Sequence, residues 1–151
     1  MYRLSDGACI RTIGSRGSGN GEFASTGYGG VAFDSEGNLV VTDWSNHRVQ
    51  VLRYSDGAHV RTIGHKGRGA GRFTFPSGVA FDAAGHIVVL EYGNCRVQVL
   101  RYSDGAHVRT IGGSRGSGNG QFYDPYGGIA IDSDGRIVVA DTNNHRVQDL
   151  E

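Results

Sequence analysis

Residues 53–64, RYSDGAHVRTIG, recur without a change as residues 101–112, and a close copy, RLSDGACIRTIG, occupies residues 3–14. Between these copies lies a second repeated stretch, GGVAFDSEGNLVVTDWSNHRVQVL at residues 29–52, with counterparts at residues 77–100 and 127–150. The chain of 151 residues therefore consists of three copies of one unit. So much identity within one chain indicates recent duplication or engineering.

Each unit contains four short runs of β-prone residues. In the second unit these are residues 78–81, 86–90, 96–101 and 106–111, and Gly85 and Gly105 supply the positive φ that the first and last hairpin turns require. The first three runs are almost wholly apolar, which indicates strands buried on both faces of their sheet. Such four-stranded units are typical of β-propeller blades, whereas the repeats of a solenoid are usually shorter or helical. We therefore predict an all-β fold, a β-propeller with three four-stranded blades per chain.

The order of the strands predicts how the ring closes. We expect a single domain over residues 1–151, with an outer strand at 3–14, repeats at 15–64 and 65–112, and a repeat at 113–150 that lacks its own outer strand. Closed propellers have about four to eight blades, so three blades cannot close on themselves. Two chains related by a two-fold axis would form a six-bladed homodimer in which residues 3–14 complete the partner's last blade. A lone open half-ring is the alternative.

The repeated stretch at residues 29–52 resembles the NHL repeat, in particular its Asp-x-x-Asn-His-Arg-Val core. The second unit departs from this core with Glu91 in place of Asp and Cys95 in place of His. The resemblance covers the whole chain and implies blades of a six-bladed propeller. Because the set occurs once per blade, we interpret it as structural, with the carboxylate and the arginine paired at the turn between the second and third strands. The set comprises Asp43, Asn46, His47, Arg48, Glu91, Asn94, Arg96, Asp141, Asn144, His145 and Arg146.

No catalytic, cofactor or metal site is predicted. The six histidines lack the close spacing of a zinc site. Some NHL-like propellers are lyases that hold a metal through histidines on their inner strands, but the inner strands expected here, such as residues 31–34 and 129–132, contain none. The glycine-rich links at residues 14–23 and 112–122 lack the Gly-Lys-Ser/Thr ending of a phosphate-binding loop, and no helix follows them. We interpret these links as flexible connections and the protein as not an enzyme.

One face of the ring is predicted to carry the ligand site. Lys plus Arg and Asp plus Glu both number 15, so the chain as a whole has no pull toward nucleic acid or anionic membrane. Basic and aromatic residues nevertheless gather in the links and the neighbouring turns, and the opposite hairpins are acidic. The candidates are Arg16, Trp44, Lys66, Arg68, Arg72, Tyr92, Arg115 and Tyr126, with Phe23, Tyr28, Phe75 and Tyr123 in the same links. We favour a self-assembling scaffold that binds proteins or peptides; the alternative is binding of single-stranded RNA, which such a mixture also suits.

The two cysteines, Cys9 and Cys95, occupy different positions in their blades, so we expect two free thiols rather than a disulfide. No apolar run is long enough to span a bilayer, and the N-terminus lacks the apolar region of a secretory signal. We therefore expect a soluble protein of a reducing, cytoplasmic compartment and no membrane partner.

Overall fold

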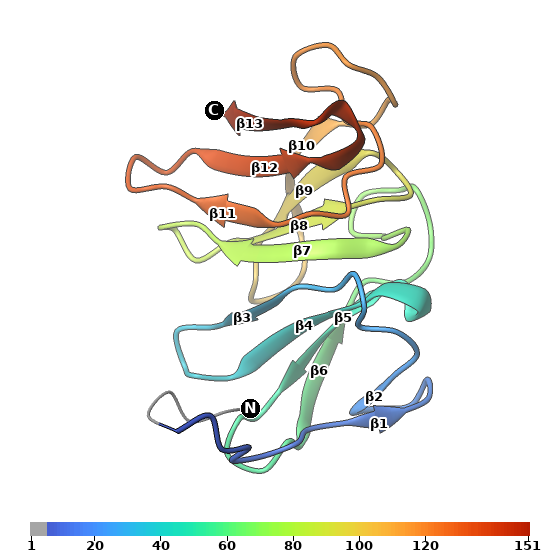
Figure 1. Ribbon diagram of the computed structural model, residues 1–151. Helices are drawn as coiled ribbons and strands as arrows, with labels where there is room; N and C mark the ends of the chain where they lie inside the picture. Colours follow the sequence, from blue (N-terminus) through green and yellow to red (C-terminus); the bar gives the residue numbers. More distant parts are fainter. Residues whose placement is uncertain (1–5) are drawn as a thin grey trace.

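The computed structural model describes residues 6–151, which form a stack of three antiparallel sheets, here called blades 1 to 3 (Figure 1). Blade 1 contains β3 (Val31–Phe33), β4 (Leu39–Asp43), β5 (Arg48–Leu52) and β6 (His59–Ile63), paired in that order. Blade 2 contains β7 (Pro76–Phe81), β8 (Ile87–Glu91), β9 (Arg96–Leu100) and β10 (His107–Gly112), and blade 3 contains β11 (Ile129–Ile131), β12 (Ile137–Asp141) and β13 (Arg146–Leu150). The strands predicted for the second unit agree with β7–β10 to within two residues at each end.

Four short elements were not predicted. Two 3-10 helices, η1 (Trp44–Asn46) and η2 (Thr142–Asn144), join the second and third strands of blades 1 and 3. The strands β1 (Ser15–Arg16) and β2 (Glu22–Phe23) form a parallel pair inside the first glycine-rich link. Its counterparts in the other links are single parallel bridges, Lys66 with Phe73 and Arg115 with Phe122. These pieces are too short to leave a periodic pattern in the sequence.

The predicted outer strand at residues 3–14 is not found as a strand. Residues 3–5 lie outside the described residues, and residues 6–14 belong to none of the strands β1–β13. The physical reason is the lack of a partner, since β5 and β9 already pair with β6 and β10. In blade 3, the third strand, β13, has no outer neighbour among the described residues. It lies at the other end of the stack from the N-terminal segment (Figure 1).

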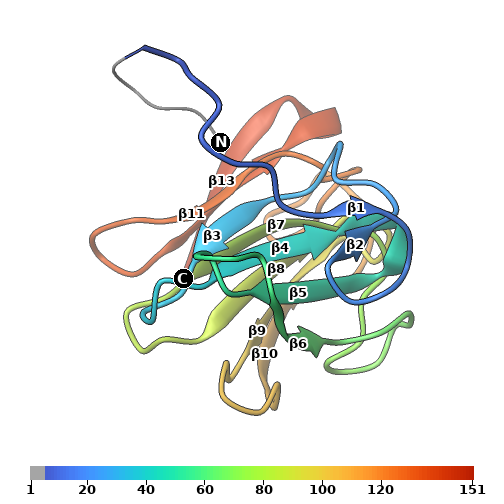
Figure 2. The ribbon, with the colours of Figure 1, turned by 90° about the horizontal axis from the view of Figure 1, so that it is seen from below.

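Apolar clusters between adjacent blades form the core. Strands β8 and β9 of the middle blade are buried along their whole length, as predicted for a blade with neighbours on both sides. Phe73 and Phe122 are wholly buried and fill the space beside Gly64 and Gly112, where a Cβ atom would lie 2.4 Å and 2.8 Å from the respective ring. Blade 1 has no such cover. In Figure 2, which looks onto its open side, the N-terminal segment and the short pair β1–β2 pass in front of this sheet, but the described residues form no further blade over β3–β6.

Glycines allow the inner strands β3, β7 and β11 to approach one another closely. A Cβ atom at Gly30 would lie 3.0 Å from the backbone nitrogen of Val79, and one at Gly78 would lie 2.8 Å from Cγ2 of Ile129. The equivalent glycine of blade 3, Gly128, has nothing within 4 Å of such an atom. The third member of this series therefore faces open space where a further blade would fit.

Candidate functional site

The repeat motif is a hydrogen-bond network around a buried carboxylate. In blade 1, Arg48 Nε donates to Asp43 Oδ2 at 2.8 Å, so the predicted ion pair is present. Asn46 Nδ2 donates to the same oxygen at 2.9 Å and to the carbonyl of Gly17 at 3.0 Å. Arg48 also donates to the carbonyl of Glu22 at 3.0 Å. The motif thus fixes the turn at η1 and also anchors the glycine-rich link above it.

The other two blades repeat this arrangement. Glu91 takes the place of aspartate and accepts from Asn94 and Arg96, while Asp141 accepts from Arg146 Nε at 2.8 Å. Burial acts to raise the pKa of Asp141, but hydrogen bonds from the Tyr123 amide and from the Asn144 and Arg146 side chains lower it below its usual value. The carboxylate at this position anchors the turn and the link in every blade, and so serves the fold.

The glycine-rich links are ordered, contrary to the prediction that they are flexible. The amides of Gly17, Gly67 and Gly116 donate to the carbonyls of Phe23, Phe73 and Phe122 at 2.9–3.1 Å. A glutamine two residues after each motif arginine completes the anchor, because its amide nitrogen donates to a link carbonyl at 2.7 Å and its oxygen accepts from a link glycine. These glutamines are Gln50, Gln98 and Gln148. Their recurrence in every repeat was the signal that sequence reasoning missed.

The histidine position of the motif connects each blade to the next one. His47 is buried with φ 54°, its Nδ1 accepts from the Phe75 amide of blade 2 at 3.0 Å, and the two rings lie 4.5 Å apart. Burial and the charge of Lys66 lower the pKa of His47. Cys95 occupies the same position toward blade 3 and is buried, which raises the pKa of its thiol. His145, at the end of the stack, is exposed.

The aromatic candidates converge on one face, the loop face, formed by the glycine-rich links and the turns that follow β4, β8 and β12. Trp44 contacts Tyr92 with ring centroids 5.1 Å apart, and Tyr126 contacts Tyr92 at 6.0 Å. Tyr28 joins them from the first link, 5.2 Å from Trp44. Phe23 does not belong to this group, because it lines the open side of blade 1 in the position where Phe73 is buried in blade 2.

The basic candidates remain distributed over the three links. The side chains of Arg16, Lys66, Arg68, Arg72 and Arg115 are all exposed. Arg115 is paired with Asp124 at 2.8 Å and lies over the ring of Tyr123 at 4.1 Å, so part of the positive charge is neutralised. The structure therefore brings the aromatic half of the predicted ligand face together and leaves the basic half dispersed.

Residues 6–151 contain neither a cluster of metal-ligating side chains nor a helix that could span a membrane. No group of three or more His, Cys, Asp or Glu side chains in this range lies close enough together to hold a metal ion. No helix in this range is long and apolar enough to cross a membrane. Neither cysteine is in a disulfide, with Cys9 exposed and Cys95 buried.

Two four-stranded sheets and one three-stranded sheet, stacked with this strand order, define the class of protein as a β-propeller. The family model of the NHL repeat matches residues 29–52, 73–100 and 127–149, at three tandem positions. The chain is a β-propeller built of NHL repeats, as the Asp-x-x-Asn-His-Arg-Val core indicates.

Solved structures with the same fold include a binding protein, an enzyme and a WD40 domain. An auxiliary nutrient binding protein from Bacteroides thetaiotaomicron aligns with a TM-score of 0.62 at 15% identity, over 99% of this chain and 42% of its own. Virginiamycin B lyase from Staphylococcus aureus aligns with a TM-score of 0.53 at 13% identity, over 79% of this chain and 39% of its own. The WD40 propeller domain of Doa1 aligns with a TM-score of 0.54 at 16% identity, over 76% of this chain and 33% of its own.

This chain thus spans less than half the length of these propellers. No curated protein matches it in sequence. At such identities the likeness shows the fold alone, and a propeller fold accommodates many different activities.

Proposed function

We propose that this chain is a non-enzymatic binding scaffold, a half-ring of three blades that a second copy closes into six, with its ligands on the loop face. The observation that carries the proposal is that the two open ends of the stack reproduce the two sides of the internal blade interfaces. The motif residues recur in every blade and anchor the glycine-rich links. Because these side chains are already engaged in the fold, we favour a binding function over a catalytic one.

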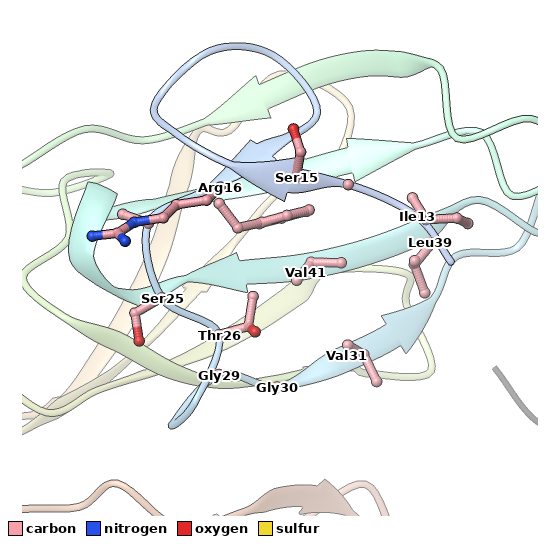
Figure 3. A pocket seen from close by; sticks show the side chains of 13 residues that line it. Ile13, Ser15, Arg16, Ser25, Thr26, Gly29, Gly30, Val31, Leu39 and Val41 are labelled. Atoms are coloured by element: carbon pink, nitrogen blue, oxygen red, sulfur yellow. The ribbon is translucent and has the colours of Figure 1, made fainter. Parts of the chain in front are cut away.

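The open side of blade 1 corresponds to the side of blade 2 that blade 1 covers. Val31 is 67% exposed, whereas its counterpart Val79 is 6% exposed. A cavity of about 620 Å³ lies on this side, and Ile13, Val31, Leu39 and Val41 contribute its apolar walls (Figure 3). An adjacent blade would fill this cavity, as blade 1 does for blade 2.

The open side of blade 3 corresponds to the sides of blades 1 and 2 that face the next blade. Val147 is 68% exposed, although its counterparts Val49 and Val97 are fully buried. One side therefore lacks a following blade and the other lacks a preceding one. A second copy supplies both, because a ring of two chains contains each of these sides twice.

The N-terminal segment already lies where the outer strand of a preceding blade belongs. The Arg11 guanidinium lies 5.7 Å over the ring of Tyr54, in the way that Arg61 lies 4.1 Å over Tyr102. A Cβ atom at Gly57 would lie 3.2 Å from Ile13, which is the counterpart of Ile63. This segment lacks the inner three strands of its blade, and blade 3 lacks the outer strand.

Charge complementarity supports a second copy as the occupant. Within blade 1, Val49 pairs with Ile63 and Val51 with Arg61 across β5 and β6. In the third repeat Asp149 stands at the position of Val51, and in the N-terminal segment Arg11 stands at the position of Arg61. The same register between two chains would therefore place Asp149 opposite Arg11 of the partner. Opposite charges across neighbouring strands stabilise their pairing.

The test uses Gly128, which has open space around it and does not require a positive φ. The unaltered chain is expected to have a mass in dilute solution near twice 16.1 kDa, measured by light scattering. Gly128→Val should fold and remain a monomer, because the added side chain would collide with the partner's inner strand as one at Gly78 would collide with Ile129.

Gly69→Val is the matched control, since Gly69 lies in a link where only the flexible side chain of Arg72 is near. This variant should form the dimer. A monomeric unaltered chain, or a dimeric Gly128→Val variant, would show that the second copy is not the occupant of the open sides.

RNA binding by the basic links is the second candidate, and the exposure of the five cationic side chains supports it. Affinity for a single strand should then fall by about 0.7 log units per log unit of salt for each phosphate contacted. Replacing Arg68, Arg72 and Arg115 with Gln should flatten this slope. The dispersal of these charges and the pairing of Arg115 favour the opposite result, little binding at physiological salt.

A further inference from the structure

Four aromatic rings on the loop face form a closed circuit around one cavity, here called the aromatic cage. Successive ring centroids are 5.2 Å apart for Tyr28 and Trp44, 5.1 Å for Trp44 and Tyr92, 6.0 Å for Tyr92 and Tyr126, and 5.6 Å for Tyr126 and Tyr28. These four residues alone line a cavity of about 250 Å³. The four rings come from the loops of three blades, so the folded stack assembles the cage.

The shape of the cage favours a compact group over a flat one. Neighbouring rings are inclined to one another by 41–60°, and none of the four neighbouring pairs is parallel. A planar base stacks best between or upon parallel ring faces, and no two neighbouring rings of the cage are parallel. The cavity is also smaller than the roughly 300–1,000 Å³ of pockets for drug-sized ligands. A small rounded head group matches it better.

The electrostatics of the cage favour a positive charge. Aromatic rings carry negative charge on their faces, and a cation close to several of them is held by cation–π attraction. The lining contains no charged side chain that could form an ion pair with a carboxylate, and its polar groups are the tyrosine hydroxyls and the Trp44 indole N–H. Arginines of the described chain lie over Tyr54, Tyr102 and Tyr123 and not over any of the four cage rings. The cage is therefore left for an external group.

We infer that the aromatic cage binds a methylated ammonium group, as found in choline headgroups and in trimethylated lysine. The methyl groups fill the cavity while the charge interacts with the rings. This inference rests on the proposed function, which puts ligands on the loop face, and it names the class of ligand that one site on that face would bind. It does not depend on ring closure, because all four rings belong to one chain.

Trp44, the only tryptophan in the chain, reports directly on the cage. Choline should change its fluorescence saturably, with a millimolar Kd in line with one cation–π site partly open to water. The neutral analogue 3,3-dimethylbutanol, which has the same shape without the charge, should bind about tenfold more weakly.

Tyr126→Leu removes one ring and should weaken choline binding about tenfold, whereas Tyr126→Phe should keep the affinity. Tyr123→Leu is the matched control, because Tyr123 is exposed nearby but is not part of the cage, and it should leave the affinity unchanged. The mass of each variant in solution shows separately whether the ring has closed.

Glycerophosphocholine and a trimethyllysine peptide then distinguish a lipid headgroup from a modified protein as the source, according to which binds more tightly. Equal binding of choline and its neutral analogue would overturn the inference, and so would a lack of fluorescence change at high choline concentration. A single-stranded oligonucleotide that binds more tightly than choline and displaces it would identify the cage as a base-stacking site instead.

Discussion

Val147→Ala is the substitution that measures most directly what the open side of blade 3 contributes to assembly. Val147 is 68% exposed in the single chain, and its counterparts Val49 and Val97 are fully buried, so ring closure should cover about two thirds of this side chain. Two buried methyl groups are worth about 1.6 kcal/mol, and two thirds of this is about 1.1 kcal/mol per interface. A ring contains the interface twice, so the dimer should lose about 2.2 kcal/mol, which raises its Kd about 40-fold.

Sedimentation equilibrium over a series of concentrations measures this Kd. Val108→Ala is the matched control. Val108 is 48% exposed and lies on β10, the outer strand of blade 2, and blade 2 already has a blade on each side within the single chain. Its Kd should equal that of the unaltered chain. Equal effects of the two substitutions, or no effect of Val147→Ala on the Kd, would refute the assignment of this side as the closing interface.

Three further outcomes are expected. Arg11→Asp and Asp149→Arg should each weaken dimerisation about tenfold, since a like-charge pair then occurs twice per ring, and the double variant should restore it in the same sedimentation assay. Native thiol titration should count Cys9 quickly and Cys95 slowly, because burial shields Cys95 and raises its thiol pKa, and denaturing titration without reductant should count two; the absence of any free thiol after denaturation would show that the two cysteines form a disulfide. Glu91→Gln should destabilise blade 2 by about 3–5 kcal/mol in denaturant unfolding, because a guanidinium then lies in a buried site without its carboxylate, and an unchanged midpoint would show that the pair is dispensable.

Local features of the fold could be predicted from the sequence. The strands and hairpins of the second unit follow from short apolar runs bounded by glycine, and Gly85 and Gly105 do adopt positive φ, at 79° and 73°. The pair of Asp43 and Arg48 could be predicted as well, because both side chains lie at one turn and are directly opposite across β4 and β5. Such features depend on residues close in the chain.

Features that depend on the packing of links and blades could not be predicted in the same way. The ordered links rest on Gln50, which reaches the carbonyl of Glu22, 28 residues away. The contact between Tyr28 and Tyr126 depends on the angle between blades, because these residues belong to the first and third repeats. Sequence spacing places both on one face but does not determine that their rings meet.

The glycines between the inner strands have a consequence for the stoichiometry of assembly. Gly30 and Gly78 set how closely successive inner strands approach, and hence the rotation from one blade to the next. The contact between blades is heterologous, so nothing in it limits the number of subunits; only the accumulated rotation decides whether a ring closes or an open helix grows. Larger side chains at these two positions should therefore change the angle between successive blades, and with it the number of chains that the proposed ring needs in order to close, while the chemistry of each contact stays the same.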